Sequence, residues 1–269
     1  MKLQIFQVDA FTSVPFRGNP AAVVPLDAWL ADETMLAIAA ENNLAETAFF
    51  VGGNGRYALR WFTPTVEIDL CGHATLASAF VLSDVLKTES SEISFETKSG
   101  ELRTSRDGDR FILDFPSRPA VETEVPGGLV EALGAAPQKV LKSRDYLALY
   151  ETESEIAALK PDLRAMAELD AHAVIVTAKG ETSDFVSRFF APSVGVDEDP
   201  VTGSVHCTLI PYWAEQLGKN DLFARQISAR GGELYCPFQG DRVKIGGNAV
   251  LYLKGEIYVE TEAEKSVGA

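Results

Sequence analysis

A ten-residue segment that occurs twice is the strongest constraint on how this chain can fold. Residues 60–69 read RWFTPTVEID, and 128 positions later residues 188–197 read RFFAPSVGVD. Five of the ten aligned positions are identical, and three more are conservative replacements. One recurrence at this distance indicates two homologous lobes rather than a solenoid of many short repeats.

A small polar turn and then a strongly apolar stretch follow each copy of the segment. The first turn is formed by residues 71–73 and leads into residues 74–86, whereas the second is formed by residues 199–204 and leads into residues 204–213. Because both stretches are apolar nearly all round, we expect two buried helices. Pro211 is expected to kink the second helix, since proline removes a hydrogen bond from a helix interior.

The remaining pattern is dominated by short alternating segments that are typical of strands and hairpins. Roughly equal helix and strand with many hairpins indicates an α+β protein with mostly antiparallel sheets, each curved around one apolar helix. Prolines and glycines near residues 116–128 mark a boundary. We therefore place an N-terminal lobe at 1–118 and a C-terminal lobe at 119–249, and leave open a return of the strand at about 250–269 to the first lobe.

Composition excludes several classes of partner. The net charge of −15 and the isoelectric point near 4.7 argue against nucleic acid and anionic membranes, which both require a basic face. The longest apolar region, residues 74–82, is too short to cross a bilayer. No signal sequence opens the chain, and three cysteines do not make a disulfide framework, so we expect a cytoplasmic protein.

Glu46 is the first candidate for chemistry because it interrupts the apolar, strand-like run of residues 44–51. Taken alone, a carboxylate in such a run is expected on the solvated face of a strand. A buried Glu46 would instead be suited to proton transfer, because desolvation makes a carboxylate a stronger base. The residue pattern leaves both interpretations open.

The two polar turns are the second candidate. Backbone N–H groups at a helix N-terminus bind anions, so the turns could hold the carboxylate of a small substrate, flanked by His73 and Asp199. The simpler interpretation is capping, with Thr202 and Ser204 capping one helix and Cys71 merely buried. The repetition of the turn in both lobes favours the functional interpretation.

Other sites have weaker support. Residues of metal-ligand type are present, but they lack the spacing of a zinc site, and the last two are expected to pack within the second helix: Cys71, His73, His206 and Cys207. There is no G-x-S-x-G elbow of a hydrolase. No glycine-rich loop joins a strand to a helix in the way that nucleotide binding requires. We therefore predict neither a metal nor a cofactor.

At these residues the sequence resembles the phenazine-biosynthesis isomerase (PhzF-like) family. The resemblance spans nearly the whole chain, and its motifs are residues 62–77 and 198–206, with supporting segments at residues 8–12, 16–24, 43–47, 243–247 and 255–257. It implies a diaminopimelate-epimerase-like fold with two pseudo-symmetric lobes and an active site between them. A homodimer is usual for the family.

The resemblance also implies a cofactor-independent isomerase. In it, Glu46 moves a proton between carbons of a small unsaturated or cyclic carboxylate, and the supporting positions fall on His73 and Asp199. The substrate-binding positions implied are Cys71, Gly72, Gly203 and Ser204.

Two alternatives remain. One is an epimerase or racemase of an amino or hydroxy acid that uses Cys71 with Asp199 or Glu46. The related epimerases use one cysteine in each lobe, but Asp199 stands opposite Cys71 here, so a two-thiol racemase is disfavoured. The other alternative is a homologue that binds a ligand or a protein without turnover.

Overall fold

The computed structural model describes residues 1–90 and 92–259 of the chain. Contacts divide the chain into two compact units. Among the described residues, the first unit contains Met1–Phe16, Pro20–Phe111 and residues 249–259, and the second contains Arg17–Asn19 and Ile112–Asn248. The division after Phe111 falls a few residues before the lobe boundary predicted at 118. Of the strand predicted at about 250–269, residues 260–269 lie outside the described residues.

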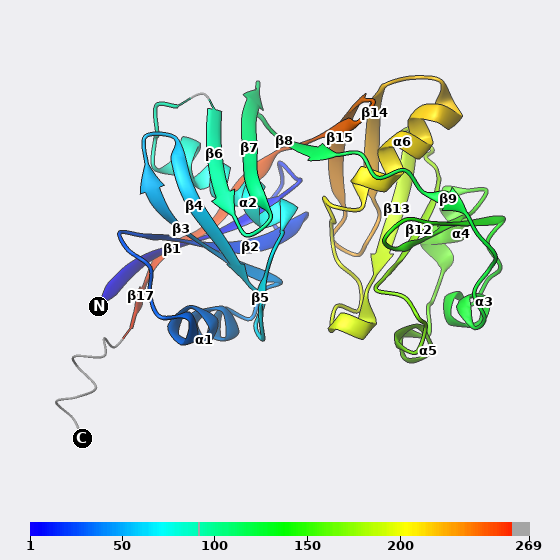
Figure 1. Cartoon of the computed structure of the whole chain (residues 1–269), viewed down its shortest axis with the longest axis horizontal. Helices are drawn as coiled ribbons and strands as arrows, with labels where there is room; N and C mark the ends of the chain where they lie inside the picture. Colours follow the sequence, from blue (N-terminus) through cyan, green and yellow to red (C-terminus); the bar gives the residue numbers. More distant parts are fainter. Residues whose placement is uncertain (91, 260–269) are drawn as a thin grey trace. The chain divides into compact units, whose positions relative to one another are not determined.

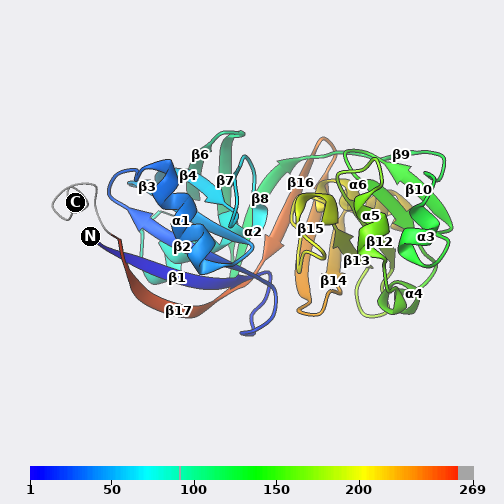
Figure 2. The same cartoon turned by 90° about the horizontal axis from the view of Figure 1, so that it is seen from below.

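The first unit is built on a mixed sheet. Its strands are β1 (Lys2–Ala10), β2 (Asn19–Leu26), β3 (Glu46–Gly53), β4 (Arg56–Phe62), β5 (Glu67–Ile68), β6 (Glu92–Thr97), β7 (Gly100–Asp107) and β17 (Ala249–Tyr258). Strand β17 pairs antiparallel with β1, and the two run side by side in both views (Figures 1 and 2). Further along, β2–β3 and β4–β6 are parallel, whereas β3–β4 and β6–β7 are antiparallel.

Two helices accompany this sheet. Helix α1 (Asp32–Asn42) contacts β3 and β4, and helix α2 (Gly72–Phe80) contacts β1 and β3. All of α2 from Gly72 to Ala79 is buried, which confirms the prediction of a central apolar helix. The helix continues into a π-helical turn, Val81–Val85. The first unit thus surrounds α2 along its length.

The second unit repeats this plan. Its strands are β8 (Arg110–Pro116), which carries the chain in from the first unit, β9 (Val121–Glu122), β10 (Lys139–Lys142), β11 (Tyr146–Leu149), β12 (Val174–Lys179), β13 (Phe185–Phe190), β14 (Asp221–Gln226), β15 (Gly232–Gln239) and β16 (Arg242–Gly247). Here β11–β12 and β13–β14 are parallel, whereas β12–β13 and β14–β15 are antiparallel.

The order of parallel and antiparallel pairs is therefore the same in the two units. The repeated segment occupies equivalent places, since it starts in β4 in the first unit and in β13 in the second. A buried helix follows each copy, α2 in one unit and α6 (His206–Leu217) in the other. The α+β class and the two similar lobes predicted from the repeat are confirmed.

Helix α6 starts later than the sequence indicates. The predicted start was Ser204, but Ser204 and Val205 belong to a turn in which the N–H groups of His206 and Cys207 donate to the carbonyls of Gly203 and Ser204. Pro211 lies inside the helix and has no N–H to offer to the carbonyl of Cys207. That carbonyl accepts from the backbone N–H of Arg118 instead, at 2.8 Å. The helix runs on to Leu217, and a kink at Pro211 stays a prediction.

Shorter helices complete the second unit: α3 (Leu129–Leu133), α4 (Glu153–Ala158), α5 (Leu163–Ala167) and the single 3₁₀ turn Pro192–Val194. Helices α3 to α5 contribute to one apolar core with β12 and β13. Among the described residues, no helix combines the length and the apolar character needed to span a bilayer.

Candidate active site

In the first unit, Glu46 is the first residue of β3, where the chain enters the sheet from helix α1. Its backbone is in register with Ala21 of β2, so its position is fixed by the parallel ladder. Only 14% of the Glu46 side chain is exposed to solvent. The solvated position expected from the residue pattern alone is therefore wrong, because tertiary contacts cover this end of the strand.

His73 is the group that covers Glu46. It is the second residue of α2, and its side chain is 6% exposed. Its Nε2 atom lies 3.0 Å from Oε2 of Glu46, which is the distance of an ion pair. The carboxylate is the more accessible member of the pair, since its exposed fraction is about twice that of the imidazole.

The second ring nitrogen of His73 lies next to Cys71. The Sγ atom of Cys71 lies 3.5 Å from Nδ1 of His73, so one ring joins the thiol to the carboxylate of Glu46. Burial raises the pKa of the Cys71 thiol to about 11, and the thiol is protonated at neutral pH. Cys71 is the N-cap residue of α2, yet its side chain makes no capping hydrogen bond.

The charge state of His73 follows from these neighbours. Burial by itself lowers the pKa of His73, but the interactions with Cys71 and Glu46 outweigh it and raise the pKa well above 6.5. Since the thiol is neutral in this range, the carboxylate of Glu46 is the charge that favours the imidazolium. At neutral pH the pair is therefore a buried imidazolium beside a partly accessible carboxylate.

The same three side chains contain the ligand types of a metal site. Donor atoms of Glu46, Cys71 and His73 lie within 4.8 Å of one another. However, Cys71 and Glu46 face opposite nitrogens of one imidazole, and a single ion binds through only one of these nitrogens. The arrangement is that of a chain of proton donors and acceptors rather than a cup around an ion.

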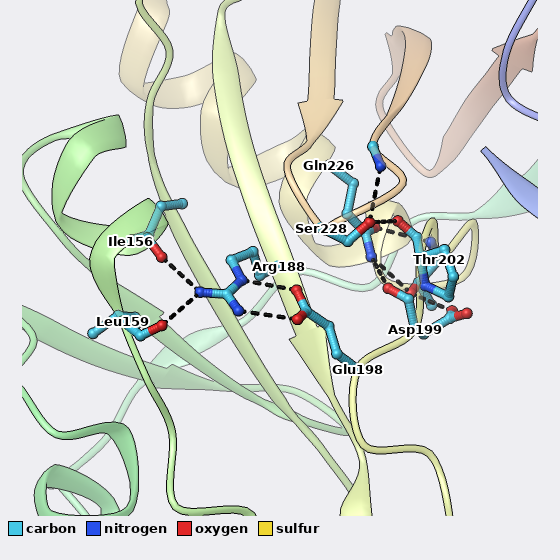
Figure 3. Close-up of polar contacts among 10 residues, drawn as sticks. Ile156, Leu159, Arg188, Glu198, Asp199, Thr202, Gln226 and Ser228 are labelled. Carbon is cyan, nitrogen blue, oxygen red and sulfur yellow. Dashed lines mark hydrogen bonds and ion pairs between the residues drawn. The ribbon is translucent and has the colours of Figure 1, made fainter. Parts of the chain in front are cut away.

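In the second unit, the loop after β13 carries Glu198 and Asp199, whose side chains diverge (Figure 3). Glu198 accepts two hydrogen bonds from Arg188, at 2.8 and 2.9 Å. The guanidinium of Arg188 also donates to the carbonyls of Ile156 and Leu159 at the end of α4, both at 3.0 Å. This clamp ties the loop to the strand and to the helix outside it.

Asp199 lies on the other side of the loop. Its Oδ1 atom accepts from Nδ2 of Asn19 at 2.7 Å, and its Oδ2 atom accepts from the hydroxyl of Thr202 at 2.5 Å. Two donors thus fix the orientation of the carboxylate. Thr202 was considered as a helix cap from the sequence, and that is wrong, because its hydroxyl bonds to Asp199.

Gly203 and Ser204 form the turn between Asp199 and α6. Gly203 is buried and Ser204 is half-buried. Ser204 is also not the N-cap of α6, because that position belongs to Val205 and has no side-chain cap. His206, just beyond the turn, is fully buried, and its Nδ1 lies 2.8 Å from the carbonyl of Thr202. Burial lowers the pKa of His206 to about 4, so the neutral ring donates to that carbonyl and packs as predicted.

The repeated segment contributes an equivalent clamp to each unit. In the first unit, Arg60 donates to both oxygens of Glu67 at 2.7 and 2.8 Å, and to Asp32 at the start of α1 at 2.9 Å. Each arginine also lies over the phenylalanine two positions later, Arg60 over Phe62 and Arg188 over Phe190. Two of the identical pairs, Arg60 with Arg188 and Phe62 with Phe190, thus have a structural role. The turns that follow and differ between the copies hold His73 and Asp199.

Three functional candidates escaped the sequence prediction: Asn19, Thr202 as a partner of Asp199, and Gln226. Asn19 belongs to a segment that supports the family resemblance, so a signal existed for it. Gln226 ends β14 without any motif, and only the three-dimensional structure brings it to the loop.

Comparison with known proteins agrees with this architecture. The profile of the family described as phenazine biosynthesis-like protein matches residues 8–255. An uncharacterized isomerase of Pseudomonas aeruginosa is 55% identical over 259 residues, which cover 96% of this chain and 100% of the relative. The phenazine biosynthesis-like domain-containing protein of Homo sapiens is 41% identical over 289 residues, covering 96% of this chain and 99% of the relative.

Solved structures show the same relationship. A crystal structure of a PhzF-family phenazine biosynthesis protein from Enterococcus faecalis aligns with a TM-score of 0.94 at 45% identity, covering 96% of this chain and 100% of that one. A probable proline racemase from Agrobacterium radiobacter aligns with a TM-score of 0.64 at 13% identity over 97% of this chain and 93% of that one, which shows a shared epimerase-like fold. From the profile match and the relatives together, the chain belongs to the phenazine biosynthesis-like (PhzF-like) family of isomerases.

Proposed function

We propose that the chain is a cofactor-independent isomerase in which Glu46 takes a proton from one carbon of a small unsaturated or cyclic carboxylate and returns it to another. The observation that carries this proposal is the Glu46–His73 pair, in which Oε2 and Nε2 are 3.0 Å apart and both side chains are largely buried. A positioned carboxylate of this kind contributes roughly 10²–10⁴-fold to a proton transfer.

Glu46 rather than His73 is the base that meets the substrate. The carboxylate keeps more exposure than the imidazole, and the imidazolium already carries its proton and cannot accept another. Cys71 is excluded as a base at neutral pH because its pKa is about 11. Within this cluster, the carboxylate is therefore the only group that is both accessible and able to accept a proton.

His73 supplies charge balance during the transfer. Before the reaction, the carboxylate and the imidazolium have no net charge as a pair. When Glu46 accepts a proton, the pair gains one positive charge at the moment when the substrate gains one negative charge on carbon. A charge that is prearranged in a buried site stabilises such a transition state without reorganisation. The same charge then favours return of the proton from Glu46.

The backbone around His73 suits a substrate carboxylate. Gly72 and His73 are the first residues of α2. The side chain of the N-cap residue, Cys71, makes no hydrogen bond to the N–H groups at this end of the helix. N–H groups in this position bind anions. In the second unit, the first N–H groups of α6 are already used within the turn, so we assign the equivalent role to the backbone of Gly203 and Ser204.

Asp199 is proposed to orient and polarise the substrate. Its two oxygens are held by Asn19 and Thr202, which leaves it as a fixed acceptor rather than a mobile proton carrier. The overall reaction is redox-neutral, since the proton that leaves one carbon is delivered to another. The proposal therefore requires neither a metal nor an organic cofactor.

A homodimer is also proposed, and light scattering on the purified chain tests it.

The decisive experiment is solvent exchange. A panel of small unsaturated and cyclic carboxylates is incubated with the enzyme in deuterium oxide, and deuterium on carbon is followed by NMR. We expect Glu46→Gln to abolish incorporation, because the amide is isosteric but cannot accept the proton. Glu41→Gln, at an exposed position in α1, is the matched control and should exchange like the wild type. Undiminished exchange in Glu46→Gln would end the assignment.

A further inference from the structure

The loop that carries Asp199 contains no regular helix or strand between the bridge residue Val196 and the turn at Gly203. Such a loop has no ladder of backbone hydrogen bonds to keep its shape, although the N–H of Asp199 donates to the carbonyl of Phe189 at 3.1 Å, so side chains supply further bonds. Arg188 holds Glu198 at one end, as described above. A different residue holds the part that contains Asp199 and Thr202.

That residue is Gln226, the last residue of β14, which is 1% exposed. Its Oε1 atom accepts from the backbone N–H of Thr202 at 2.8 Å. Its Nε2 atom donates to the carbonyl of Asp199 at 2.7 Å and to the hydroxyl oxygen of Thr202 at 3.2 Å. The orientation of the amide is chemically determined, because a backbone N–H only donates and a carbonyl only accepts.

These bonds also set the direction of the Thr202 hydroxyl. Since its oxygen receives a hydrogen from Gln226, the hydroxyl hydrogen is free to point at Oδ2 of Asp199, 2.5 Å away. Figure 3 shows the resulting sequence of contacts from Gln226 through Thr202 to Asp199. The amide thus acts on the carboxylate through one intervening hydroxyl and, at the same time, anchors the backbone on both sides of it.

We propose that Gln226 is a positioning residue that fixes the orientation of the Asp199 carboxylate through Thr202. This proposal rests on the proposed function only for its effect on turnover. Its effect on Asp199 itself is independent of any substrate. Gln226 does not touch the reacting atoms in this assignment, and its role is to hold a group that does.

The other ionisable groups around the loop are either paired or neutral. Glu198 is paired with Arg188. Arg230 donates to the carbonyls of Gly18 and Arg17, next to Asn19. His206, packed beneath the turn, is neutral because its pKa is about 4. These groups are common to the wild type and to the variants below, so differences in the titration of Asp199 report on the Gln226–Thr202 arrangement.

The direct test is the titration of Asp199 in protein labelled with ¹³C-aspartate, with the resonance assigned by Asp199→Asn. Gln226→Met removes all three hydrogen bonds at nearly constant shape. Gln226→Glu keeps an acceptor for the Thr202 N–H but draws the hydroxyl hydrogen of Thr202 away from Asp199. We expect both variants to raise the pKa of Asp199 by about one unit. In Gln226→Glu the Thr202 hydroxyl turns toward the new carboxylate, whereas in Gln226→Met the backbone at Asp199 and Thr202 loses the anchors that keep the hydroxyl against Asp199.

Three further variants separate this role from simple stabilisation of the loop. Ser228→Ala is the matched control, because Ser228 anchors the same loop through the carbonyl of Pro200 at 2.7 Å but does not contact the Asp199 side chain. It should leave the titration of Asp199 unchanged. Thr202→Val should reproduce the shift seen in the Gln226 variants, and Thr202→Ser, which keeps the hydroxyl, should restore the wild-type titration.

With a substrate from the exchange panel, Gln226→Met should lower kcat by roughly 10-fold to 100-fold with a smaller change in KM, because a misplaced catalytic group affects the transition state more than binding. A wild-type titration of Asp199 in Gln226→Met and Gln226→Glu overturns the proposal, as does an equal shift in Ser228→Ala. If Glu46→Gln still exchanges deuterium while the Asp199 titration shifts as expected, the proposed function fails and the positioning role stands.

Discussion

The Nε2 atom of His73 lies 3.0 Å from Oε2 of Glu46, and the two residues come from the second position of a buried helix and the first position of a neighbouring strand. Neither side chain has a rigid position by itself. The burial of α2 by its sheet fixes the distance between them. The contact therefore depends on the packing of the whole first unit, and its loss is expected to affect both chemistry and stability.

Replacement of His73 tests the charge-balance role. His73→Gln keeps a hydrogen-bond donor of similar reach but removes the positive charge. We expect kcat to fall by roughly 10²–10³-fold, the range for loss of one prearranged electrostatic contact. Steady-state kinetics and deuterium exchange on the same substrate provide the measurement. An unchanged kcat would show that the imidazolium plays no part in the transition state.

The same residue makes stability depend on pH. The pKa of His73 in the folded protein is raised above its ordinary 6.5, so the folded state binds the proton more tightly than the unfolded state. The resulting stabilisation is complete below pH 6.5 and is lost as the pH rises through the raised value. Chemical unfolding at several pH values should show this alkaline loss in the wild type. His73→Gln should lack it, and an identical pH dependence in the two proteins would contradict the ion pair.

Cys71 distinguishes the isomerase from a thiol-based epimerase. Because the thiol is protonated at neutral pH, Cys71→Ala should retain deuterium exchange within about tenfold of the wild type. Alkylation by iodoacetamide at pH 7 should also be slow in the folded protein, since the thiol is buried. Complete loss of exchange in Cys71→Ala, in a variant that still folds, would favour the epimerase.

The clamp in the first unit predicts a loss of stability in acid. The hydrogen bonds from Arg60 lower the pKa of Glu67 from 4.5 to about 2, despite the opposing effect of burial. A carboxyl with a depressed pKa stabilises the folded state above its unfolded pKa, and this contribution is lost as the pH falls from about 4.5 toward 2. Glu67→Gln should flatten that part of the curve of unfolding free energy against pH. A Glu67→Gln protein with the full wild-type acid dependence would show that the clamp is not responsible.

A buried hydroxyl in the second unit provides a stability test away from the site. Thr177 accepts from the indole N–H of Trp213 at 3.0 Å and donates to the carbonyl of Val186 at 2.6 Å. Thr177→Val keeps the shape but removes both bonds and leaves the buried indole N–H without its Thr177 acceptor, which should cost about 1–3 kcal/mol. Denaturant unfolding measures this cost. Thr177→Ser keeps the hydroxyl and should lose clearly less.

Much of the fold could be predicted because its signals are local. The alternating segments, the turns and the two apolar helices are visible within short windows, and the repeat relates one half of the chain to the other. The predicted start of α6 at Ser204 was wrong for a physical reason. Ser204 has the chemistry of a cap, but the chain closes a tight turn there first, and the Thr202 hydroxyl is used by Asp199.

The site was harder to predict because its contacts are long-range. Burial of Glu46 depends on His73, which lies on a different element, so an isolated carboxylate in a strand gave no reason to expect it. Gln226 is a single polar residue at the end of an ordinary strand. Its importance comes from which loop passes next to it, and no periodicity or motif in the chain encodes that neighbour.

The two arginine clamps suggest how such a protein can acquire new chemistry. Arg60 and Arg188 hold their loops through carboxylates that precede the candidate site residues, and neither clamp contacts Glu46, His73 or Asp199 in the bonds described. The two clamps can therefore stay constant while the few residues that follow each clamp vary. Mutational libraries confined to residues 71–73 and 199–204 would explore new reactions while leaving both clamps in place.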